Sequence, residues 1–171
     1  MRRWLPLLVA FASACAAPTK SIAPPPPAAA SVALPAIALT SLDGAPARLD
    51  RVLRGRVAVV SLWATWCEAC AAEFEALGRL SERAESRGAT VIAVAVGEPH
   101  DKVADFVKWR GLKYAQLVDE EFRFADALGQ RRVPATLIVD GSGRVTFVGG
   151  ALDETALAAL RAALDARVAA R

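Results

Sequence analysis

Residues 63–70 read Trp-Ala-Thr-Trp-Cys-Glu-Ala-Cys, and this segment decides how the rest of the chain is interpreted. It follows residues 57–63, an apolar and β-branched run that predicts a strand buried on both faces. Beyond it, apolar residues recur at three- and four-residue steps, which predicts a helix over residues 67–86. Two cysteines, Cys67 and Cys70, therefore stand where a buried strand passes into a helix.

The spacing and position of these cysteines favour redox chemistry. Side chains three residues apart on a helix have β-carbons about 5–6 Å apart, so a disulfide closes between them with little movement. Unpaired backbone N–H groups and the helix dipole stabilise a thiolate at the first position and lower its pKa. Cys67 is the expected nucleophile. Cys70, one turn inside and less exposed, is expected to resolve a mixed disulfide by attacking Cys67.

Two structural interpretations of the cysteine pair are weaker. A structural zinc site needs about four ligands, and the other candidates are His100 and Cys15, of which Cys15 lies in the leader. No metal site is therefore predicted. A purely structural disulfide closing so short a loop would add little stability.

Strand and helix patterns alternate along the rest of the chain, which predicts an α/β domain with a central mixed sheet covered on both faces. Before the cysteines, the turn dipeptide Asp43-Gly44 predicts a short hairpin over residues 37–49, and Asp50 is expected to cap a turn of helix. After them we expect strands at residues 91–96, 114–118, 137–139 and 145–148, and helices at 101–110, 120–128 and from Asp153 onward.

The N-terminus has the pattern of a secretory signal. Arg2 and Arg3 precede a run of about nine apolar residues, which is too short for the roughly twenty that span a bilayer. Small residues then lead into Cys15, which resembles the lipobox of bacterial lipoproteins, although Ala12 stands where that motif prefers leucine. The resemblance implies lipidation of Cys15, with ordinary signal cleavage nearby as the alternative.

These patterns divide the chain into three parts: a signal peptide and lipobox (1–15), a Pro/Ala-rich linker (16–34) and a folded domain (35–171). The linker contains Pro24 to Pro27, which favour an extended polyproline II chain. Fifteen such residues reach on the order of 45 Å, enough to hold a domain away from its anchor. A proline-rich ligand for a partner module is the weaker interpretation.

The charge balance argues against nucleic-acid binding. The chain has 21 Lys and Arg against 18 Asp and Glu, but Arg2, Arg3 and Lys20 are the only charged residues before Asp43. The rest of the chain is therefore neutral, with no basic block to follow a phosphate backbone.

Residues 34–167 resemble the thioredoxin-like proteins of the TlpA/ResA type. The resemblance rests on the segment 63–70, on Glu73, on Val-Pro-Ala-Thr at 133–136, and on the 140–143 turn with its closing hairpin. It implies a thioredoxin fold, a central mixed sheet flanked by helices on both faces, with an N-terminal β-hairpin extension. Proteins of this type are exported, membrane-tethered thiol–disulfide oxidoreductases.

The resemblance also implies roles for individual residues. Pro134 would be a cis-proline facing the disulfide, presenting the backbone of Val133 to a client peptide. Trp66 would be a surface aromatic that shields Cys67 and contacts substrate, with a core position as the alternative. Glu73 would tune the thiols or relay a proton, or would be a solvated helix residue, and both interpretations stay open.

Three positions depart from the family pattern. Ala69 replaces the proline usual before the second cysteine, and Glu75 stands where the family often has a proline. Ser61 occupies the position where cytoplasmic thioredoxins carry a buried aspartate. Without that carboxylate, Glu73 is the expected substitute, and the reduction potential stays open.

The function implied is reduction of protein disulfides on the periplasmic side of a bacterial membrane, for example those of apocytochromes c. The clients would be proteins with cysteine pairs, a membrane thiol–disulfide donor would regenerate the dithiol, and no cofactor beyond the redox-active disulfide is expected. Oxidation of exported dithiols uses the same residues and stays open. Peroxiredoxin-like peroxide reduction, copper delivery and a non-catalytic binding module are weaker alternatives.

Overall fold

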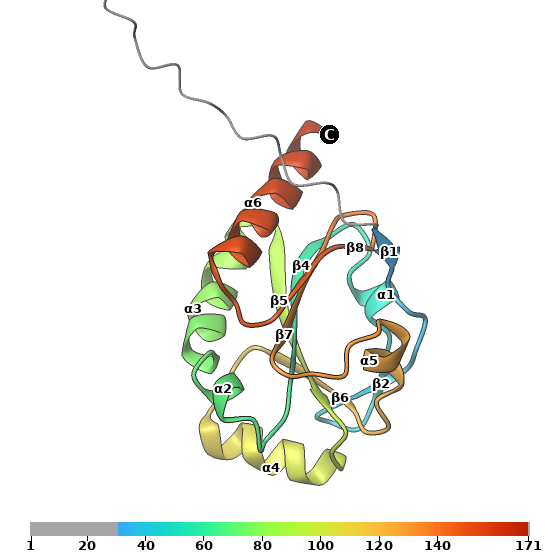
Figure 1. Ribbon diagram of the computed structural model, residues 1–171, viewed down its shortest axis with the longest axis vertical. Helices are drawn as coiled ribbons and strands as arrows, with labels where there is room; N and C mark the ends of the chain where they lie inside the picture. The colour runs from blue at the N-terminus through green and yellow to red at the C-terminus, as the bar shows by residue number, and fades with distance from the viewer. Residues whose placement is uncertain (1–30, 171) are drawn as a thin grey trace, which may run out of the picture.

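Strand β4 (Val57–Trp63) runs through the middle of the sheet that the computed structural model shows for residues 31–170 (Figure 1). All seven of its side chains are buried, as the continuous apolar run predicts. It pairs in parallel with β5 (Ala89–Val96), which pairs in parallel with β6 (Ala115–Asp119). On its other side it pairs antiparallel with β7 (Ala135–Val139). The expected mixed sheet is confirmed.

Short strands extend the sheet at both edges, giving the order β1-β8-β7-β4-β5-β6-β2-β3. Beside β7 lie β8 (Arg144–Gly149) and the two-residue β1 (Val32–Ala33). Beside β6 lies the predicted N-terminal hairpin, β2 (Leu39–Ser41) and β3 (Pro46–Ala47). Gly44 lies in the turn between β2 and β3 and has a φ of +83°, which glycine adopts without steric cost.

Helices cover both faces of the sheet and enclose two apolar cores (Figure 1). One core lies under α2 (Glu68–Ala71), α3 (Phe74–Ala84), α4 (His100–Arg110) and α6 (Glu154–Ala169). The other lies under α1 (Leu49–Val52) and α5 (Arg123–Ala127). Asp153 caps α6 as predicted, its carboxylate accepting the Ala156 N–H at 2.9 Å.

The helix expected over residues 67–86 is interrupted after α2. The Glu73 N–H bonds the Cys70 carbonyl three residues back, so the chain tightens there before α3 begins. A single tightened turn leaves the spacing of the apolar residues along the sequence unchanged. Hydrophobic periodicity alone therefore does not reveal the break. A 3₁₀ turn over Glu85–Arg87 and a left-handed Gly88 then end the segment.

Two further predicted boundaries need correction. Asp50 does not cap α1, because Arg48 takes the N-cap position and binds the Asp50 carboxylate through two hydrogen bonds of 2.9 and 2.6 Å. The helix expected over residues 120–128 shortens to α5, because Phe122 takes a positive φ of 58° directly before it.

The predicted signal peptide, Cys15 and most of the predicted linker lie outside the described residues, and the end of that linker forms β1 instead. Within residues 31–170, no helix is long and apolar enough to cross a membrane.

Candidate active site

Cys67 and Cys70 form a disulfide at the start of α2, with their α-carbons 5.3 Å apart. Cys67 is the N-cap residue of this helix, and its Sγ accepts the backbone N–H of Cys70 at 3.1 Å. A sulfur held at this end of a helix is where the aligned N–H groups and dipole favour an anion. The local geometry is therefore the one that the sequence predicts for a stabilised Cys67 thiolate.

The two cysteines of the disulfide differ in how far they are exposed to solvent. Cys67 is 7% exposed and Cys70 1%, which agrees with the expected order of exposure. Trp66 is 65% exposed beside them, so it lies on the surface rather than in the core. Trp63 is buried and packs edge-on against Phe74, with ring centroids 5.1 Å apart.

The peptide bond between Val133 and Pro134 is cis. Strand β7 begins directly after it, and Ala135 pairs with Leu62 near the end of β4. The sheet therefore brings Pro134 to the same end of β4 from which the chain continues to Cys67. Val133 packs against the apolar cluster that contains both cysteines.

Glu73 stands between the disulfide and the loop before α6. Its Oε1 accepts the backbone N–H of Leu152 at 2.7 Å, and its side chain is half-buried. Burial raises the pKa of Glu73 above its ordinary value, Asp153 adds to the rise, and the hydrogen bond from Leu152 opposes it. The description of Glu73 as a merely solvated helix residue is therefore incomplete. Ser61 is buried in β4, paired with Ala93 and Thr136.

Glu98 is a buried acid at this end of the sheet that the sequence interpretation missed. Its side chain is 3% exposed; one carboxylate oxygen accepts the Thr65 N–H at 2.6 Å, and the other accepts the Thr65 hydroxyl at 2.5 Å and Lys102 Nζ at 2.6 Å. Burial acts to raise the pKa of Glu98, but the hydrogen bonds from Lys102 and Thr65 outweigh it and hold that pKa below its ordinary value. Glu98 therefore fixes the backbone two residues before Cys67.

A signal for Glu98 was present in the sequence. Parallel strands end at the same edge of a sheet, and Trp63 at the end of β4 pairs with Ala95 near the end of β5. A charged residue just after the second buried strand belongs beside the cysteine loop. Among residues 31–170, no cluster of three His, Cys, Asp or Glu side chains could hold a metal ion.

The fold and the Cys-x-x-Cys disulfide define a thioredoxin-like protein. The chain belongs to the Redoxin family, which it matches over residues 29–164. It is 31% identical over 111 residues to the thiol-disulfide oxidoreductase ResA of Geobacillus thermodenitrificans. That match covers 65% of this chain and 63% of the relative, so it spans just under two thirds of either protein.

Solved structures agree on the fold. A secreted thiol-disulfide isomerase from Corynebacterium glutamicum superposes with a TM-score of 0.65 at 29% identity, covering 78% of this chain and 84% of that one. A thioredoxin-family thiol:disulfide interchange protein from Chlorobium tepidum gives 0.64 at 26% identity, covering 80% and 98%. The expected thioredoxin fold and the resemblance to the ResA type are confirmed.

Proposed function

We propose that this chain is an extracytoplasmic thiol–disulfide oxidoreductase that reduces protein disulfides through Cys67 and Cys70. The observation that carries the proposal is the disulfide at the start of α2, in which Cys67 Sγ accepts the Cys70 N–H. The names of the ResA and interchange-protein relatives support the same chemistry.

The reaction begins with the dithiol form of the protein. The Cys67 thiolate attacks one sulfur of a client disulfide, that S–S bond breaks, and the second client sulfur leaves as a thiolate that takes up a proton. Cys70 then loses its proton and attacks Cys67 Sγ. The mixed disulfide breaks, the client leaves fully reduced, and its two electrons have come from the pair now oxidised. Glu73 is our candidate for relaying the proton of Cys70.

Client binding would use the backbone and aromatic surface around the cysteines. An extended client segment would hydrogen-bond to the backbone of Val133, in the manner of strand addition, with Pro134 facing the disulfide. Trp66 supports this role because its exposed ring offers apolar contact directly beside Cys67.

The cellular setting in the proposal comes from the sequence. The signal pattern and Cys15 support an exported, lipid-anchored protein on the periplasmic side of a bacterial membrane, with the part of the predicted linker before β1 as the spacer. A membrane thiol–disulfide donor would regenerate the dithiol, and apocytochromes c are candidate clients. Equal membrane retention of a Cys15→Ala variant would contradict lipid anchoring.

The first test is the reduction potential of the Cys67–Cys70 pair in thiol buffers. A value near the thioredoxin range, about −270 mV, supports a reductase, whereas about −120 mV reverses the direction to oxidation of client dithiols. Absence of a reversible disulfide would contradict both directions.

A trapping experiment tests the roles of the two cysteines. Cys70→Ser should accumulate a mixed disulfide with a model disulfide client, because nothing then resolves the Cys67 adduct. Cys67→Ser is the matched control and should trap almost none. Equal trapping by the two variants would contradict the assignment of Cys67 as nucleophile.

A further inference from the structure

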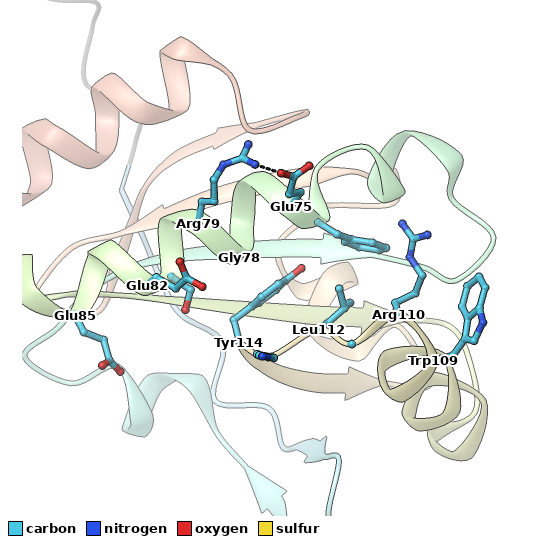
Figure 2. A pocket seen from close by; sticks show the side chains of 13 residues that line it. Glu75, Gly78, Arg79, Glu82, Glu85, Trp109, Arg110, Leu112 and Tyr114 are labelled. Carbon is cyan, nitrogen blue, oxygen red and sulfur yellow. Dashed lines mark hydrogen bonds and ion pairs between the residues drawn. The ribbon is translucent and has the colours of Figure 1, made fainter.

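Helix α3 borders two hollows that differ in the charge of their lining. On the side toward α4 it borders a hollow whose charged lining is mixed: Glu75, Glu82 and Glu85 with Arg79, Arg110 and Lys113 (Figure 2). On the side toward α6 it borders a separate groove lined by Arg83 and Arg87, and no acidic side chain lines that groove. The hollow toward α4 thus has charges of both signs, whereas the charged side chains of the groove toward α6 are all basic.

The groove between α3 and α6 has an apolar floor and a basic rim. Its volume is about 340 Å³, near the lower limit for small-molecule sites. Leucines form much of its floor: Leu80, Leu152, Leu157, Leu160 and Leu164. The rim carries Arg83 and Arg87 from the α3 side and Arg161 from α6, all exposed. This combination fits an apolar chain that bears a negative charge.

The arginines of the rim lack partners within the described part of the chain. Arg79, Arg83 and Arg87 follow one another at four-residue steps, a spacing at which like charges destabilise a helix. Arg79 is paired with Glu75, but Arg83, Arg87 and Arg161 form no ion pair among residues 31–170. An anion in the groove would relieve this repulsion.

One end of the groove lies near the place where the chain enters the folded domain, at Leu34. A second hollow shares Leu164 and Arg87 with the groove and adds Arg167, whose side chain lies against Gly141 in the turn between β7 and β8. The N-terminal segment joins the domain at this same turn, since the Leu34 N–H bonds the Gly143 carbonyl at 3.1 Å. The predicted linker therefore enters the domain at this end.

The disulfide lies at the opposite end of the sheet. Val139, just before this turn, pairs with Ala58 near the start of β4, whereas Cys67 follows the end of that strand. Seven residues of strand separate the two ends by roughly 20 Å. A bilayer against the basic end of the groove would leave Cys67 free to meet clients.

We propose that the groove between α3 and α6 binds acidic phospholipid at a membrane surface. An acyl chain lies against the leucines, and Arg83, Arg87 and Arg161 hold the anionic headgroup. The site goes beyond the proposed redox function and does not depend on it.

The test uses the full chain with Cys15→Ser, so that no attached lipid contributes. Binding to phosphatidylglycerol vesicles is compared with binding to phosphatidylcholine vesicles by flotation, and the contribution of the groove is taken from the variants below, because the leader with Arg2 and Arg3 is the same in all of them. The chain should prefer the anionic vesicles, and added salt should weaken that preference. Arg83→Gln with Arg161→Gln should lower the preference about thirtyfold, since each basic residue near an anionic surface contributes about fivefold.

The matched control is Lys108→Gln with Arg123→Gln, which removes the same charge from exposed positions on α4 and α5, two helices that follow the strand ends nearest the disulfide. It should keep the preference, and both double variants should keep wild-type reduction of a soluble disulfide client. Equal loss in the two double variants, or no loss in either, would overturn the lipid site. Arginine-dependent binding of monomeric decanoate without vesicle binding would also overturn it, in favour of a free fatty acid.

Discussion

Glu98 shows how a single side chain can hold a redox loop from outside the motif. Its carboxylate binds both the N–H and the hydroxyl of Thr65 and pairs with Lys102, while its own side chain is almost completely buried. Hydrogen bonds to a buried charged group are among the stronger ones in proteins. The conformation before Cys67 therefore depends on a residue 31 positions further along the chain.

The first prediction concerns Glu98→Gln. We expect the free energy of unfolding to fall by about 2 kcal/mol near neutral pH, because charge-assisted hydrogen bonds are lost. The pKa of Glu98 is lowered in the folded protein, so its stabilisation is present above the ordinary glutamate pKa and is lost as pH falls through the lowered value. In urea unfolding, the free energies of unfolding of wild type and Glu98→Gln should therefore differ less near pH 3 than near pH 7.

Glu82→Gln is the control for this experiment, because Glu82 is exposed and forms no ion pair among the described residues. Its effect should stay within about 0.5 kcal/mol. A Glu98→Gln effect as small as that of Glu82→Gln would show that the contact with Thr65 contributes little.

The second prediction concerns Glu73→Gln. The folded protein raises the pKa of Glu73, mainly by burial, so the native state binds a proton more readily than the unfolded chain. Stability contributed by this group is therefore fully present below its ordinary pKa and is lost as pH rises through the raised value. Relative to wild type, Glu73→Gln should gain stability between about pH 4 and neutrality. If the free energies of unfolding of wild type and Glu73→Gln, measured in urea, differed by the same amount at every pH, this prediction would be contradicted.

At the scale of elements, the connection from β5 to α4 leaves no room for a side chain at its first residue. Gly97 has a φ of +69°, and a β-carbon there would lie 1.8 Å from the ring of Phe122. Phe122 itself has a positive φ. This close approach places Glu98, the next residue, under the cysteine loop.

The third prediction compares two glycine substitutions. Gly97→Ala should lower the free energy of unfolding by about 2 kcal/mol or more, because both the positive φ and the contact with Phe122 oppose a β-carbon. Gly78→Ala should raise it by about 0.5–1 kcal/mol, since Gly78 lies inside α3 with nothing within 4 Å of the added atom. Thermal unfolding of both variants checks the opposite signs. A shift of the same sign for both would contradict the argument.

At the scale of the whole molecule, one sheet separates two apolar cores that must form together. Leu77 lies in the core under α3 and Leu53 in the core on the opposite face, and each is at most 1% exposed. Strand β4 contributes side chains to both cores, so neither face can be lost without exposing the other.

The fourth prediction follows from this shared sheet. Leu77→Ala and Leu53→Ala should each lower the free energy of unfolding by about 2–5 kcal/mol. Each variant should unfold in a single transition, so that the change in tryptophan fluorescence, to which exposure of the buried Trp63 contributes, coincides with far-UV circular dichroism. Separate transitions for the two probes in the Leu53→Ala variant would show that the two cores unfold independently.

Much of the fold could be predicted because its signals are local. The continuous apolar run fixes β4, left-handed glycines end α4 and the 3₁₀ turn after α3, and Asp153 starts α6. The break between α2 and α3 could not be predicted, because it leaves the apolar spacing unchanged. The prediction that Asp50 caps α1 was wrong, because the Asp50 carboxylate accepts hydrogen bonds from the neighbouring Arg48 instead of from the backbone.

The sequence by itself determined the chemistry of this protein, because a cysteine at a helix N-terminus and its partner three residues later are set by adjacent residues. It also determined the strand–helix order and the buried strand that ends at Trp63, whereas a core position for Trp66 stayed open until the structure placed it on the surface. Tertiary structure alone decided what surrounds the disulfide: the contact of Glu98 with Thr65, the bond between Glu73 and Leu152, and the arginine-rimmed groove between α3 and α6. Hydrophobic periodicity tells which side of an element is buried. It does not tell which distant element packs there, and each of these contacts joins segments that only the folded sheet and its packed helices bring together.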